Sequence, residues 1–222
     1  SSFVLLEEHP NTAFIADSMA TLNSGTPTCD WPTVLGVEDN LSSDGGIFVA
    51  DPGINCVVHW APGAKAGTVV AGGQDRGDRL DQLCGPFGVA LAPDGGVFVA
   101  DTDNNRVVHW APGAEASTVV AGGHGDGFRL DQLCCPEGVA LAPDGGVFVA
   151  DSGNYRVVHW APGAEAGTVV AGGLGCGDRL DQFSYPRSVA LDPDGGVFVA
   201  DSRNYRVVHW APGAEAGTVV AG

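Results

Sequence analysis

Residues 88–123 read GVALAPDGGVFVADTDNNRVVHWAPGAEASTVVAGG, and most of this stretch returns along the chain at a spacing of 50 residues. Its central segment GGVFVAD occupies 95–101, 145–151 and 195–201, with GGIFVAD at 45–51. The segments VVHWAPGA and TVVAG each occur four times with the same spacing. Residues 87–136 and 137–186 differ at only 11 of 50 positions. A period of this length indicates a fold built from repeated copies of one supersecondary unit.

Each unit predicts four short strands separated by turns. In the second unit we expect strand A at Gly88–Leu91, strand B at Val97–Ala100, strand C at Arg106–Ala111 and strand D at Thr118–Gly122. Val, Phe and Trp favour strands, whereas Pro-Asp-Gly and Pro-Gly favour turns. No stretch shows a helical period. Strand B is apolar on both faces, which is typical of a sheet packed between two others. The sequence therefore predicts an all-β fold, a β-propeller of four-stranded antiparallel blades.

One unit resembles a known repeat family in detail. Residues 175–207 read GCGDRLDQFSYPRSVALDPDGGVFVADSRNYRV, which is similar to the NHL repeat. The resemblance extends over about 37–222 as four successive units, and it implies a β-propeller. It implies no single function, because the family includes lyases, ligand sensors, RNA binders and interaction platforms.

The repeats also set the expected domain organisation. Residues 1–36 depart from the pattern, because Asp17 and Asp51 would be equivalent but lie 34 residues apart instead of 50. We interpret 1–36 as a degenerate first blade or a seam segment. Five blades, or a fragment of a six-bladed ring, are both compatible with this arrangement. The regular units cover 37–222, as about 37–86, 87–136, 137–186 and 187–222.

Charge excludes one class of partner. The chain has 27 acidic and 10 basic side chains, a formal charge of −17, and Lys65 is its only lysine. Nucleic-acid binding needs clustered Lys and Arg, so we expect no nucleic-acid partner. No apolar run approaches the roughly 18–20 residues of a membrane span. No signal-peptide pattern is visible. We expect a soluble chain with no direct membrane insertion; its compartment stays unknown, and association with a membrane complex stays open.

Differences between the units gather on one side of the expected blade. Because strand direction alternates, the D–A connections (such as 123–135) and the B–C turns (such as 101–105) share one face, here called the connection face. Nine of the 11 differences between 87–136 and 137–186 lie in these two segments. Drift of unconstrained loops is the alternative explanation. We predict a partner-binding surface on the connection face, with candidate residues Asp103, Asn105, His124, Asp126, Phe128, Tyr155, Leu174, Asp178, Tyr185 and Tyr205.

Two residue types recur in every unit, and we interpret them as structural. An Asp follows each strand B, where it can cap the next turn or pair with the Arg five residues on. A ring of Ca²⁺-binding carboxylates is the less favoured alternative. A Trp near the end of strand C offers a large buried surface with one N–H that needs an acceptor, and the His before it is assigned to packing. These structural positions are Asp51, Asp101, Asp151, Asp201, Trp60, Trp110, Trp160 and Trp210.

Motifs for chemistry are lacking. The six Cys include no C-x-x-C pair, so free thiols are expected. No Ser–His–Asp set or phosphate loop stands out. We therefore predict no catalytic residue, no metal site and no cofactor.

Two functions follow as hypotheses. The first is a non-catalytic propeller scaffold that mediates protein–protein interaction, as an accessory subunit of a larger complex. The alternative is a propeller hydrolase or lyase with a metal in the axial channel. A catalytic propeller should place unlike titratable residues around its axis, whereas we expect this array to repeat the same residues there. The balance favours a protein that is not an enzyme.

Overall fold

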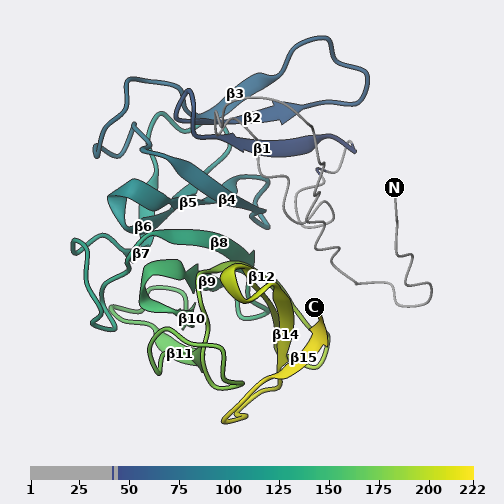
Figure 1. Ribbon diagram of the computed structural model, residues 1–222. Coiled ribbons are helices and arrows are strands. Elements are labelled where there is room, and N and C mark those ends of the chain that lie inside the picture. The colour runs from purple at the N-terminus through teal and green to yellow at the C-terminus, as the bar shows by residue number, and fades with distance from the viewer. Residues whose placement is uncertain (1–41, 43–44) are drawn as a thin grey trace, which may run out of the picture.

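The computed structural model describes Ser42 and residues 45–222. In this part of the chain four antiparallel sheets follow one another around an arc, from the first at the top to the last at the lower right (Figure 1). Three of the sheets have four strands, and three strands of the first sheet are described. The all-β fold and the four-stranded antiparallel blades are confirmed. The segment 1–36, expected as a degenerate blade or seam, lies outside the described residues.

Each blade is a meander, because its strands pair in chain order. The first blade contains β1 (Ile47–Asp51), β2 (Cys56–Trp60) and β3 (Thr68–Gly72). The second contains β4 (Pro86–Leu91), β5 (Val97–Asp101), β6 (Arg106–Trp110) and β7 (Thr118–Gly122). The third contains β8 (Pro136–Leu141), β9 (Val147–Asp151), β10 (Arg156–Trp160) and β11 (Thr168–Gly172). The fourth contains β12 (Pro186–Leu191), β13 (Val197–Asp201), β14 (Arg206–Trp210) and β15 (Thr218–Ala221).

The strands lie where the repeats place them, with small shifts at their ends. Strand A begins at Pro86, two residues earlier than expected, because Pro86 is paired with Asp101 across a register shift. Asp101 itself belongs to strand B, since it pairs with Arg106 at the start of strand C. Each of the last three B–C turns contains a single 3-10 turn, at Thr102–Asn104, Ser152–Asn154 and Ser202–Asn204.

Hydrophobic cores lie between consecutive blades. The core between the second and third blades joins Ala100 and Val107 of one sheet to Val149 and Trp160 of the next. Leu133, from the connection between these blades, fills the space between them and is fully buried. Leu83 and Phe183 occupy the equivalent places at the other two junctions. Each of these connections therefore supplies one large apolar side chain that packs between the two blades it connects.

In the last three blades strand A (β4, β8 and β12) is the innermost strand, and β8 packs against both β4 and β12. A Cβ atom added at Gly138 of β8 would lie 2.8 Å from the carbonyl oxygen of Arg187 on β12. Gly88 on β4 lies equally tightly against the backbone of Glu137 and Gly138. Glycine permits this close approach, because any side chain would meet the neighbouring backbone.

The recurrent Trp residues act in packing. In the last three blades the side chains are at most 4% exposed, and each indole N–H donates to the carbonyl of Ala114, Ala164 or Ala214 at 2.9–3.0 Å. Trp60 is 41% exposed.

In the described part of the chain no helix is long and apolar enough to cross a membrane.

Candidate functional site: the connection face

Hydrogen bonds place the B–C turns and the D–A connections on the same face. The side-chain oxygen of Asn55 accepts from the backbone N–H of Gly85 at 2.9 Å, and that of Asn105 accepts from Cys135 at 2.8 Å. The backbone N–H of Asp103 donates to the carbonyl of Cys84 at 3.1 Å. The B–C turn of the second blade therefore supports the connections on both sides of it.

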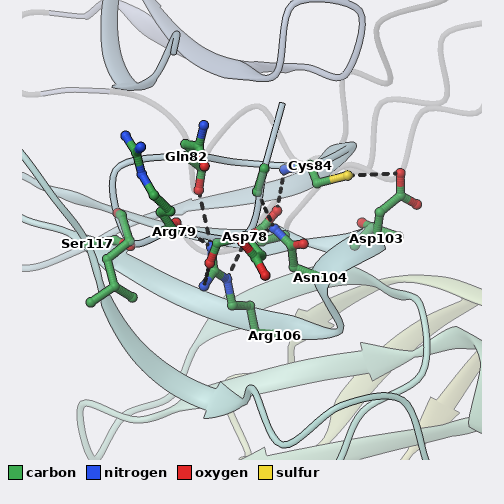
Figure 2. A network of polar contacts seen from close by, with 12 residues as sticks. Asp78, Arg79, Gln82, Cys84, Asp103, Asn104, Arg106 and Ser117 are labelled. Atoms are coloured by element: carbon green, nitrogen blue, oxygen red, sulfur yellow. Dashed lines mark hydrogen bonds and ion pairs between the residues drawn. The ribbon is translucent and has the colours of Figure 1, made fainter. Parts of the chain in front are cut away.

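A buried ion pair fastens each connection to the following blade. Asp101 is fully buried; one carboxylate oxygen accepts from the Cys84 N–H at 2.7 Å, and the other accepts from Nε of Arg106 at 2.7 Å. The rest of the Arg106 guanidinium donates to the carbonyls of Asp78, Arg79 and Gln82 in the connection (Figure 2).

The same ion pair recurs in the next two blades. Asp151 with Arg156 and Asp201 with Arg206 are 2.7 and 2.8 Å apart, and each Arg reaches the equivalent three carbonyls. Burial raises the pKa of Asp101 and of Asp151 above the ordinary value, against hydrogen bonds and the guanidinium charge that act to lower it. These carboxylates are fully occupied by their own chain, which is what a structural role requires.

The first blade shows what happens without the arginine. Cys56 stands at the arginine position, and burial raises the pKa of its thiol. One oxygen of Asp51 instead accepts from the backbone N–H groups of Gly53 at 2.9 Å and Ile54 at 3.3 Å. This Asp therefore caps its own turn, the first of the two roles that its sequence position suggests.

Most of the ten candidate residues point outward from the connection face. Phe128, Leu174 and Tyr205 are 82%, 64% and 76% exposed. Asp103, His124, Asp126 and Asp178 are also exposed, whereas Asn105, Tyr155 and Tyr185 are half-buried. The structure thus brings the candidates to one face but spreads them over the junctions between blades.

At the third junction, side chains form a cluster that the sequence reasoning missed. The rings of Tyr155 and Tyr185 meet edge to face at 6.2 Å between centroids, and the guanidinium of Arg203 lies 3.7 Å above the Tyr185 ring. Beside them, Nε of Arg187 lies 3.1 Å from the carboxylate of Glu137. Glu137 is 7% exposed, and burial raises its pKa although both arginines act to lower it.

We expected the blades to repeat the same residues around the axis. This is wrong for one position near the start of the inner strands. Phe87, Glu137 and Arg187 occupy the same place near the start of the inner strands β4, β8 and β12. Likewise Asp103, Gly153 and Arg203 are equivalent in the B–C turns. Comparing the fourth unit with the other three, instead of only the two central units, would have revealed these positions.

The other candidates for chemistry are engaged in packing. His109 lies against the Phe98 ring at 5.0 Å, with Nε2 3.3 Å from Asp94, and His159 repeats the arrangement with Phe148 and Asp144. Within the described residues no three His, Cys, Asp or Glu side chains are grouped as metal ligands would be. The described Cys are free thiols, and burial raises the pKa of Cys134 to about 12.

Grooves at the outer edge recur from junction to junction. One of about 1000 Å³ lies between the second and third blades, lined by Val119, His124, Trp160 and Glu165. A smaller one of about 500 Å³ is lined by equivalent residues between the first and second blades. These grooves belong to the repeat itself and do not single out one place on the molecule.

Comparison with known proteins identifies the repeats. The NHL repeat family matches residues 83–110, 133–160 and 183–210. Each match begins at the buried residue from the connection, Leu83, Leu133 or Phe183, and ends at the Trp that closes strand C. No curated protein sequence gives a match.

Solved structures with a similar fold have different functions. An auxiliary nutrient binding protein from Bacteroides thetaiotaomicron is 14% identical, with a TM-score of 0.56 over 74% of this chain and 44% of that one. A catalytically inactive virginiamycin B lyase from Staphylococcus aureus, with quinupristin, is 12% identical, with a TM-score of 0.53 over 82% and 54%. A gluconolactonase from Xanthomonas campestris is 14% identical, with a TM-score of 0.60 over 81% and 60%.

Such identities show the fold alone, and this chain spans only about half the length of these proteins. The shared fold together with the three matched repeats is nevertheless sufficient to identify the architecture. The chain carries NHL repeats and has the β-propeller fold of the proteins that it resembles.

Proposed function

We propose that this propeller is a non-catalytic scaffold that binds a protein partner through its connection face, as an accessory subunit of a larger complex. The observation that carries the proposal is the position of the differences between near-identical units. Phe128, Leu174 and Tyr205 project from this face, and no other unit has the same residue at the position of Phe128 or Leu174. Exposed aromatic and large apolar side chains are the usual anchors of protein interfaces.

The buried ion pairs support this role. Because Arg106, Arg156 and Arg206 hold the backbone of each connection, the outward side chains of the connection can change without loss of its fold. A rigid frame with variable side chains is the arrangement expected of a binding surface.

Quantitative affinity capture from a lysate of the source organism tests the proposal. The variant Phe128→Ser/Leu174→Ser/Tyr205→Ser should lose specific partners that the wild-type chain retains. The matched control Val119→Ser/Val169→Ser/Val219→Ser changes three exposed side chains on the outer strands, and it should retain them. Equal capture by all three proteins would contradict the proposal.

An enzyme with a metal in the axial channel is the second candidate. One observation favours catalysis: Glu137, a buried acid with a raised pKa, lies near the start of an inner strand beside Arg187. Metal analysis of the purified chain separates the two candidates, because only the enzyme requires a stoichiometric metal. A turnover that disappears on Glu137→Gln substitution would favour the enzyme.

A further inference from the structure

Seven of the nine arginines donate to their own chain through two or more nitrogens. Arg106, Arg156 and Arg206 form the buried ion pairs, while Arg79, Arg129 and Arg179 each bind the aspartate two residues further on. Arg76 donates to Cys84 and Asp103. The two that remain are Arg187 and Arg203.

Arg187 and Arg203 keep most of their donors free. Among the described residues, Arg187 interacts only through Nε, with Glu137, and the guanidinium of Arg203 has only the Tyr185 ring beneath it. The Arg187 side chain is 51% exposed, and Arg203 is exposed. Arg187 lies two residues after Tyr185, whose ring lies beneath the Arg203 guanidinium. Two guanidinium groups therefore present unused N–H donors at one junction of an acidic molecule.

The tyrosines beside them are held at a cost to the backbone. Tyr155 has a φ of 54° and Tyr185 a φ of 57°, both in the left-handed region. The equivalent residues at the first junction are Asn55 and Gly85, which adopt this region more readily than Tyr. The side-chain oxygen of Asn55 also accepts a hydrogen bond from the backbone N–H of Gly85, whereas the two tyrosines meet only through their rings. The same conformation recurs at Asn105, Cys135 and Tyr205, so it belongs to the repeat, and at this junction two tyrosines adopt it.

We infer that Arg187, Arg203, Tyr155 and Tyr185 form a docking site for carboxylate side chains of an acidic segment in the protein partner. This inference rests on the proposed scaffold function and deepens it. Guanidinium groups bind carboxylates with paired hydrogen bonds, and Arg and Tyr dominate the energetics of interfaces.

Charge fixes where such a segment can bind. The chain carries −17, so an acidic segment is repelled from most of its surface. The third junction differs, because Arg187 and Arg203 stand where the second blade has Phe87 and Asp103. An attractive patch within a repulsive surface specifies one orientation of the partner.

Fluorescence anisotropy with defined probes tests the inference at low salt. The probe is a labelled peptide in which Glu alternates with Ser, and the comparison peptide has Gln in place of Glu. The wild-type chain should bind the Glu peptide and not the Gln peptide. The variant Arg187→Gln/Arg203→Gln should weaken binding at least about tenfold. Its melting temperature should fall, because the buried Glu137 carboxylate loses its partner, so binding is measured well below that temperature.

The matched control is Arg129→Gln/Arg179→Gln, which removes the same charge from the outer part of the connections and should leave binding nearly unchanged. Absence of binding by the wild-type chain, or equal loss in both variants, would overturn the inference. So would full competition by equimolar inorganic phosphate, since the site would then be a general anion site. If capture of the partner depends on Phe128 but not on Arg187 and Arg203, the scaffold function stands and only this inference fails.

Discussion

The carboxylate that ends strand B joins three separate parts of the chain. In the third blade Asp151 accepts from the Cys134 N–H, from the Asn154 side chain at 2.8 Å and from Arg156. Both oxygens of this carboxylate therefore accept hydrogen bonds from the chain itself, and the side chain is fully buried. Its repetition at each described blade therefore follows from its role in the fold, and a calcium ring is not needed to explain it.

Replacing Arg156 by Met should lower the free energy of unfolding by about 3–5 kcal/mol, because the buried Asp151 carboxylate loses its counter-charge and three backbone carbonyls lose their donor. Urea unfolding followed by tryptophan fluorescence measures the change.

The control for this prediction is Arg129→Met. Arg129 pairs with Asp131 on the surface, and its side chain is 71% exposed, so the loss should be about 0–1 kcal/mol. A similar small loss for both variants would show that the buried pair does not hold the connection in place.

At the scale of the strand, glycine sets how closely the blades converge. The variant Gly138→Ala should be destabilised by about 1–3 kcal/mol, because the new methyl group meets the backbone of Arg187 and Ser188 on the next inner strand. The melting temperatures of this variant and of Ser188→Ala are compared, because Gly138 and Ser188 occupy the same position in successive repeats. Ser188 naturally carries a Cβ, so its alanine variant should unfold nearly as the wild type does. Equal effects at the two positions would contradict the close packing of inner strands.

The strands could be predicted from the sequence because their pattern is local and repeated. Short runs rich in Val, Phe and Trp, separated by recurrent turn residues, predict strands B, C and D almost to the residue. The alternating direction of the strands predicts which loops share a face. The start of strand A at Pro86 could not be predicted, because it depends on pairing with Asp101 across the blade. The contact of Arg203 with the Tyr185 ring could not be predicted either. Arg203 belongs to a B–C turn and Tyr185 to a D–A connection, and neither segment contains a sequence motif that indicates the contact.

At the scale of the whole molecule, the excess of negative charge opposes folding. Raising NaCl from about 0.01 M to about 0.1 M shortens the Debye length from about 30 Å to about 10 Å, so repulsion between exposed carboxylates weakens. We expect the melting temperature to rise, and KCl to give the same rise. A fall would mean that surface pairs such as Arg129–Asp131 outweigh the repulsion of a chain with a formal charge of −17.

Site-specific photocrosslinking tests most directly whether the connection face contacts a protein. A photoreactive phenylalanine analogue would replace Phe128 or Tyr205 on this face, and Val119 or Val219 on the outer strands, all of which are exposed. We expect the two face positions to crosslink to the same partner in the native extract and the two outer positions not to do so. Crosslinking of that partner from the outer positions, with none from Phe128 and Tyr205, would contradict it.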